Sequence, residues 1–105
     1  MKKLSPQKME DVAGYFRALS EPTRLLILSI LRDGEQNVGQ LAEQCQCTSA
    51  NVSRHLSVLS AHGLVARESR GVSAYYRIAD ESVGQLCDLV CDNIVRRLEN
   101  RPDRS

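Results

Sequence analysis

The first repeating pattern in the chain is an apolar stripe within residues 6–19. Its members lie three or four positions apart, which places them on one face of a helix. They are Met9, Val12, Phe16 and Leu19. The segment is therefore predicted to form an amphipathic helix.

A second helix is predicted from residues 20–34, where apolar positions are nearly continuous. Ser20 is a candidate N-cap, and Pro22 suits the first turn because its missing N–H is not needed there. Gly34 is a typical stop signal. Because apolar residues surround nearly the whole helix, we expect it to be the central element of the core.

Two shorter helices follow, joined by a tight link. Asn37 is a candidate cap for the first, with Gln40 three residues later in the pattern of a capping box. Thr48 is a candidate cap for the second, which should stop at Gly63. Only residues 45–48 connect them, which is the layout of a helix-turn-helix. The second of the two helices is the candidate DNA reader.

The pattern then changes to a two-residue alternation over residues 64–78, and a turn at Arg70-Gly71 divides it into a β-hairpin. Helical spacing returns in residues 80–99. The apolar positions there are Val83, Leu86, Val90, Ile94 and Leu98. Residues 100–105 are polar and are expected to form a disordered tail.

This order of elements predicts a mainly α (α+β) fold, a winged helix-turn-helix with a β-hairpin wing and helices at both ends. A chain of 105 residues is one domain, small enough to benefit from a partner subunit. Hydrophobic residues make up 42%, and no apolar run approaches the roughly 20 residues of a membrane span. Glu10 and Asp11 interrupt any leader pattern, so we expect a cytoplasmic protein with reduced cysteines.

Cationic side chains gather in the middle of the chain although the net charge is only +1. Between Gln44 and Ala79 the only acid is Glu68. The bases of that stretch are Arg54, Arg67, Arg70 and Arg77. Such a surplus suits a surface that faces phosphates, and it is also compatible with an ordinary solvated face.

The outward face of the candidate reading helix is small, polar and basic. If Val52, Leu56 and Leu59 face the core, helical spacing turns the opposite set of residues outward. That set is Ala50, Arg54, Ser57 and Ala61, flanked by Asn51 and Ser53. Small side chains let a helix enter the major groove, while Asn, Arg and Ser reach base edges and phosphates. A wing carrying Arg67 beside it can grip the neighbouring minor groove or backbone.

The segment Leu19–Ile78 resembles the ArsR/SmtB family of bacterial repressors in three motifs: Ser-Glu-Pro-Thr-Arg-Leu from Ser20, Val-Ser-Arg-His-Leu from Val52, and the wing from Gly63 to Tyr76. The resemblance implies a homodimer that is not an enzyme, needs no cofactor to bind double-stranded operator DNA, and releases it when an inducer binds. A twofold dimer predicts an imperfectly palindromic operator.

Carried over by position, the resemblance also assigns site residues. The family's recognition helix falls on Thr48, Ser49, Asn51, Ser53, Arg54 and His55, and its wing tip on Arg70. Local packing or capping is the alternative role for His55. On this interpretation residues 1–99 form one DNA-binding and dimerisation domain.

The four cysteines form two pairs with different expected roles. The Cys-x-Cys motif that opens the third helix of arsenic-responsive members is replaced here by Asn37 and Gly39. Cys45 and Cys47 match apolar positions that pack beneath the reading helix in the family, so packing is favoured over a redox or metal role.

Cys87 and Cys91 lie one helical turn apart on the last helix, so two thiolates can converge on one soft ion. Two sulfurs suit a trivalent thiophilic inducer such as arsenite or antimonite better than zinc, which takes four ligands. The last helix has no histidine, which disfavours the zinc or nickel site that related repressors build there. An apolar packing stripe and a thiol redox or reactive-sulfur sensor remain alternatives. Outside this class, a protein-interaction module stays open, and a thiol-disulfide enzyme is disfavoured because no Cys-x-x-Cys opens a helix.

Overall fold

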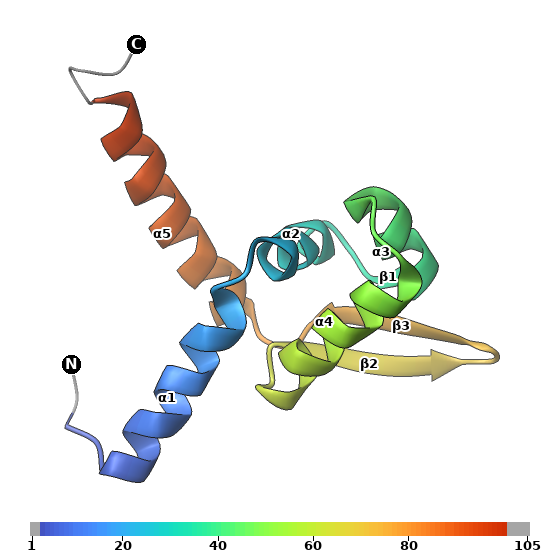
Figure 1. The fold of residues 1–105 in the computed structure, drawn as a ribbon, viewed down its shortest axis with the longest axis horizontal. Coiled ribbons are helices and arrows are strands. Elements are labelled where there is room, and N and C mark those ends of the chain that lie inside the picture. Colours follow the sequence, from blue (N-terminus) through green and yellow to red (C-terminus); the bar gives the residue numbers. More distant parts are fainter. Residues whose placement is uncertain (1–2, 101–105) are drawn as a thin grey trace.

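The computed structural model describes residues 3–100, which form five helices and a small sheet (Figure 1). The helices are α1 (Pro6–Leu19), α2 (Pro22–Leu31), α3 (Val38–Cys45), α4 (Ser49–Ala61) and α5 (Glu81–Glu99). The strands are β1 (Gln36–Asn37), β2 (Val65–Arg70) and β3 (Ser73–Ile78). Helices α2, α3 and α4 lie together with the sheet, and α1 and α5 extend to one side (Figure 1). The fold class is as predicted: α3 and α4 form the helix-turn-helix, and β2 and β3 form the wing. Of the tail predicted to be disordered, residues 101–105 lie outside the described part of the chain.

The boundary between α1 and α2 corrects one prediction. Glu21, not Ser20, is the N-cap of α2, and its carboxylate accepts the backbone N–H of Arg24 at 2.9 Å. Ser20 instead ends α1, where its hydroxyl donates to the carbonyl of Arg17 at 3.1 Å. Only two residues separate these helices, and the extended one directly before Pro22 takes the capping role.

The caps of the helix-turn-helix are those predicted. Asn37 and Gln40 form a reciprocal capping box with two hydrogen bonds of 2.8 Å. In the connecting turn Gln46 adopts the left-handed conformation, with φ 55°. Thr48 then caps α4 by accepting the N–H of Asn51 at 3.1 Å. Local side-chain chemistry therefore fixes where the reading helix begins.

The sheet contains one strand that the sequence pattern missed. The strand order is β1-β3-β2 with antiparallel pairing, and the short β1 pairs with Tyr75 and Tyr76 of β3. Arg70 pairs with Ser73, so the hairpin turn is Gly71-Val72, one residue later than predicted. Gly71 supplies the positive φ of 60° that this turn uses.

The core is formed by α2, α3, α4 and the base of the wing. Its fully buried side chains are Ile27, Leu28, Leu41, Val52, Leu56, Leu59 and Leu64. Helix α2 was expected to be buried nearly all round, but Leu25 and Leu26 are exposed.

Helix α1 contacts the body through its small residues Gly14 and Ala18. Tyr15 and Leu19 also pack against the core, so the predicted apolar stripe meets the core at Leu19 while Met9 and Phe16 remain exposed.

Helix α5 projects away from the body (Figure 1). Only Val83 and Gly84, near its start, are buried. Further along, Leu89 is 71% exposed, and Val90, Ile94 and Val95 are exposed as well. Across residues 3–100, none of the helices combines the length and the apolar character needed to cross a bilayer.

Candidate nucleic-acid interface and cysteine sites

Helix α4 buries one face and exposes a polar one. Val52, Leu56 and Leu59 point into the core. The exposed residues at its N-terminal end and middle are Ser49, Ala50, Asn51, Ser53, Arg54 and Ser57. All of them except Arg54 are small, so the backbone of α4 can approach a flat or grooved partner closely.

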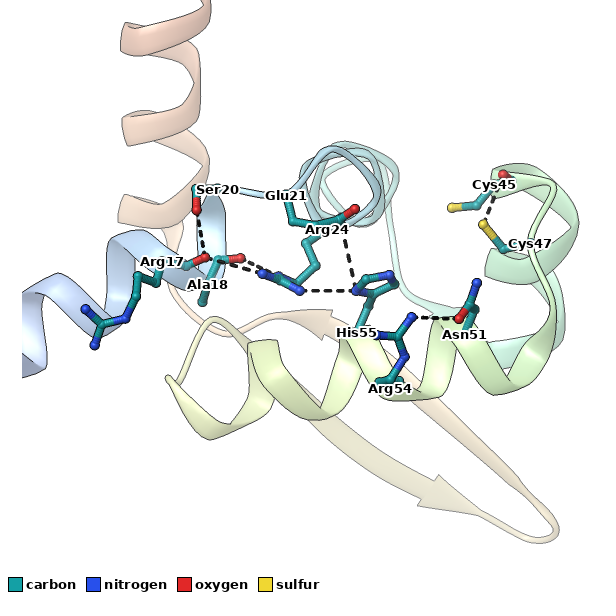
Figure 2. Close-up of polar contacts among 10 residues, drawn as sticks. All are labelled: Arg17, Ala18, Ser20, Glu21, Arg24, Cys45, Cys47, Asn51, Arg54 and His55. Carbon is teal, nitrogen blue, oxygen red and sulfur yellow. Dashed lines mark hydrogen bonds and ion pairs between the residues drawn. The ribbon is translucent and has the colours of Figure 1, made fainter.

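A hydrogen-bonded pair stands on this exposed face. Nη2 of Arg54 donates to Oδ1 of Asn51 at 2.8 Å, one helical turn away (Figure 2). The guanidinium and the amide therefore lie side by side and present donors together. Thr48 lies at the same end, but its hydroxyl oxygen already accepts the capping hydrogen bond. This end of α4 offers the groups that read base edges in a major groove.

His55 does not belong to this exposed set. Its side chain points inward, the residue is 6% exposed, and its Nδ1 lies 3.2 Å from Nη1 of Arg24 (Figure 2). This burial favours local packing, the alternative role for His55, over a direct contact with DNA. Helical spacing explains why His55 is buried, because position 55 falls on the same helical face as Val52, Leu56 and Leu59.

The wing arginines Arg67 and Arg70 differ in their contacts. Arg67 is exposed, and Nη1 donates to the hydroxyl of Ser69 at 3.1 Å. Arg70 is held by carboxylates: two hydrogen bonds of 2.5 and 2.9 Å join it to Glu35, and two of 3.2 and 3.3 Å join it to Glu68. Its guanidinium also lies 4.8 Å from the ring centroid of Tyr75.

These contacts stabilise the charged forms of the ionisable side chains at the wing tip. The carboxylates of Glu35 and Glu68 raise the pKa of the Arg70 guanidinium, and Arg70 lowers the pKa of Glu68. Glu35 stands just outside the acid-poor stretch of the sequence, which is why the charge pattern alone did not reveal this clamp. A phosphate that binds Arg70 has to compete with two carboxylates.

Cys45 and Cys47 lie at the end of α3 and in the turn, partly buried against the core. The Cys47 thiol donates to the carbonyl of Cys45 at 3.4 Å (Figure 2). Burial raises the pKa of the Cys45 thiol, and Cys47 adds to the effect. The placement is that of small apolar residues beneath the reading helix.

Cys87 and Cys91 occupy a different environment on α5. Cys87 is partly buried and Cys91 is exposed, and both line an apolar groove between α1, α2 and α5. The other residues of the groove include Phe16, Leu19, Leu25, Leu86, Val90 and Ile94. Within residues 3–100, no group of three or more His, Cys, Asp or Glu side chains is placed to hold a metal ion. One chain thus brings two sulfurs to this groove.

An ion pair beside Cys87 ties α5 to α2. Arg32, at the end of α2, pairs with Asp88, and its side chain crosses α5 at Gly84. A Cβ at Gly84 would lie 2.6 Å from Nε of Arg32, so the glycine makes room for the guanidinium. Burial raises the pKa of Cys87, Cys91 and Asp88 raise it further, and Arg32 lowers it. No local sequence pattern predicts this ion pair, because its partners lie 56 positions apart in the chain.

Comparisons with known proteins agree with this geometry. A family model described as a helix-turn-helix domain matches residues 19–68. The nodulation protein NolR of Rhizobium meliloti is 36% identical over 100 residues, covering 89% of this chain and 82% of the relative. The transcriptional regulator NmtR of Mycobacterium tuberculosis is 40% identical over 85 residues, covering 81% and 71%.

A solved structure extends the match to the whole fold. It is the homodimeric winged helix-turn-helix DNA-binding domain of a "possible ArsR-family transcriptional regulator" from Mycobacterium bovis, with a TM-score of 0.84, 32% identity and full coverage of both chains. Sequence motifs, fold and relatives thus point the same way. The chain belongs to the ArsR/SmtB family of winged helix-turn-helix transcriptional regulators.

Proposed function

We propose that the protein is a homodimeric repressor that binds operator DNA through α4 and the wing, and that a thiophilic metalloid or metal at Cys87 and Cys91 releases it. Residues 1–99 act in this proposal as one DNA-binding and dimerisation domain. The observation that carries it is the small, polar and cationic exposed face of α4. It lies opposite a buried face that is apolar except for His55, so the helix is held firmly while its outer side is left for a partner.

On this proposal the exposed face of α4 enters the major groove. Arg54 and Asn51 supply hydrogen bonds to base edges, and Ser49 and Ser53 approach phosphates or bases without steric hindrance. Arg67 and Arg70 of the wing contact the adjacent backbone or minor groove. Relatives named as transcriptional regulators and repressors support this assignment.

The second copy of the chain covers the apolar parts of α1 and α5. A single copy leaves Phe16, Leu89, Val90, Ile94 and Val95 exposed, which is more contiguous apolar surface than a monomer normally shows to water. A twofold dimer presents two α4 helices to successive major grooves. The expected operator is an imperfect palindrome.

The inducer site uses the two thiols of α5. Trivalent arsenic or antimony binds soft sulfur ligands, and two sulfurs one helical turn apart converge on one such ion. A third bond is left for a donor of the partner subunit, a small thiol, or an organic substituent that the apolar groove would accept. Burial, Cys91 and Asp88 raise the pKa of the Cys87 thiol. With arsenite, each new As–S bond would replace an As–O bond, and the thiol proton would leave with the hydroxide as water.

In this proposal the inducer releases the operator DNA through thermodynamic linkage between the two binding sites. An inducer that binds better to a dimer arrangement in which the two α4 helices no longer match the groove spacing shifts the dimer toward it. The loss of operator affinity can be no larger than the inducer's differential affinity for the two arrangements, and the coupling is mutual.

The test is fluorescence anisotropy of the reduced protein on its own promoter DNA, titrated with arsenite, antimonite, zinc and peroxide. Cys87→Ser and Cys91→Ser are compared with the matched control Cys45→Ser. We expect metalloid to release the wild type and the control but neither α5 variant. Release by peroxide alone would assign the site to redox sensing, and equal behaviour of all proteins would make the α5 pair packing. Failure of the wild type to bind promoter DNA at low salt would point to a protein-interaction module.

A further inference from the structure

One side chain, Arg24 in the first turn of α2, links three helices. Its Nε donates to the carbonyl of Ala18 at 2.6 Å and its Nη2 to that of Arg17 at 3.3 Å, both in the last turn of α1. Its Nη1 lies 3.2 Å from Nδ1 of His55, in the middle of α4 (Figure 2). Carbonyls in the last turn of a helix have no partner within the helix, so Arg24 caps α1 while it holds α4.

The contact with His55 has a defined direction. Arginine has donors only, so Nδ1 of His55 must accept and the ring carries its hydrogen on Nε2. Oε2 of Glu21 lies 3.7 Å from the same Nδ1, which is beyond hydrogen-bond length. That carboxylate instead accepts the backbone N–H of Arg24 and keeps the start of α2 in place. Because His55 is buried, the hydrogen bond from Arg24 needs an acceptor placed where Nδ1 stands.

A second contact joins α1 and α4 at the C-terminal end of α4. Gly14 of α1 faces the ring of His62, the C-cap of α4, and a Cβ at Gly14 would lie 3.0 Å from Cε1 of that ring. Helix α1 therefore holds α4 at two separate points, its middle and its end. These two contacts add to the core packing of Val52, Leu56 and Leu59 in fixing the direction of α4 relative to α1.

We propose that Arg24 and His55 are positioning residues for DNA recognition, which set α4 at a fixed angle to α1. The inference rests on the proposed function, in which α1 belongs to the dimer face and α4 reads the groove. Operator binding needs two α4 helices at the spacing of successive major grooves. Their spacing depends on how α4 is fixed to the dimer helices, and the guanidinium of Arg24 is the polar part of that connection.

Two substitutions of similar chemistry separate this role from simple packing. His55→Asn places an amide oxygen where Nδ1 stands, and His55→Gln places it where Nε2 stands. Only the first keeps an acceptor for Arg24. Affinity for the protein's own promoter and for a scrambled duplex is measured by anisotropy, well below the unfolding temperature of each variant. The ratio of the two affinities is the readout, because a general loss of stability lowers both.

We expect His55→Gln to reduce this ratio about tenfold, the effect of losing one buried hydrogen bond to a charged group, and His55→Asn to stay within about threefold. Arg24→Lys should resemble His55→Gln, because its three donors sit on one nitrogen and cannot reach acceptors that are spread around a guanidinium. The double variant Arg24→Lys, His55→Gln should lose no more of the affinity ratio than either single variant, because the two residues act as a unit.

Three results would overturn the proposal: an unchanged ratio in His55→Gln, equal losses in His55→Asn and His55→Gln, or additive losses in the double variant. If one His55 variant does not fold, Arg24→Lys decides in its place. If the wild type prefers its promoter but the Arg24 and His55 variants do not differ from one another, only this inference is refuted. A wild type without preference for its promoter removes the proposed function as well.

Discussion

Two solvent-exposed faces of the chain differ in kind. The face formed by α4 and the wing is polar and carries Asn51, Arg54 and Arg67 above a buried apolar stripe. The face formed by α1 and the distal part of α5 is apolar, with Phe16 and Leu89 more than half exposed. Both are surfaces of one small domain, and both are built on helices.

The difference shows which kind of surface is informative by itself. An exposed apolar face of this extent is rarely left in water, so it indicates a protein partner. A polar face is the ordinary state of a helix, and it gains meaning only from its arrangement beside a wing in a helix-turn-helix. The four changes below test whether each face serves the partner assigned to it.

The largest effect is expected from a charge on the apolar face. Ile94→Lys should convert the protein to monomers, and operator affinity should fall about 100-fold because one half-site no longer helps the other. Sedimentation or light scattering measures the assembly, and anisotropy measures the affinity. Gln85→Lys is the matched control, since helical spacing puts position 85 opposite position 94. Operator binding at full strength by a monomeric Ile94→Lys protein would refute the assignment.

The next largest effect is expected on the polar face. Arg54→Ala should weaken operator binding by about 10- to 100-fold, the usual cost of losing an arginine that reads a base. Arg96→Ala, which removes an exposed arginine of α5, should leave affinity nearly unchanged. Both variants should remain dimers. If the two substitutions had equal effects, α4 would have no special role in binding.

A smaller effect, in the opposite direction, is expected at the wing tip. Glu35→Gln removes the carboxylate that makes two hydrogen bonds to Arg70 and frees the guanidinium for phosphate. Exposed ion pairs contribute little, so affinity should rise only about threefold. The dependence of affinity on salt should become steeper as well. Reduced affinity would mean that Glu35 holds the wing in its DNA-binding position.

The smallest effect concerns the buried thiols. Cys45 and Cys87 have raised pKa values in the folded chain, whereas in the unfolded chain a thiol titrates at about 8.5. The folded state therefore binds more protons between the two values, and stability falls as pH rises through that window. The unfolding temperature should decrease slightly from about pH 8 upward, and less so in a Cys45→Ala, Cys87→Ala variant. An identical pH dependence in that variant would contradict the assignment.

Local signals in the sequence were enough for most of the fold. The capping box at Asn37, the cap at Thr48 and the alternation in the wing each depend on residues close together in the chain, and all three are found in the structure. The prediction of Ser20 as the cap of α2 was wrong because its neighbour Glu21 can also cap, and only the geometry of the adjoining helix decides between them.

The parts that could not be predicted depend on residues far apart in sequence. Strand β1 is only two residues long and exists because β3 lies beside it. The contact of His55 with Arg24 and the clamp on Arg70 by Glu35 need partners about 30 to 35 positions away, which no periodicity reveals. The exposed stripe of Met9 and Phe16 is a regular helical pattern, but the pattern does not say whether it meets the core or a second chain.

The most direct test of the two-face account is an NMR titration of the isotopically labelled dimer with its own promoter DNA. The account predicts that DNA shifts the signals of residues 48–54 and 65–70, while those of residues 89–95 change only when the dimer is diluted into monomers. Shifts from DNA that centre on residues 89–95 and leave residues 48–54 unmoved would contradict it.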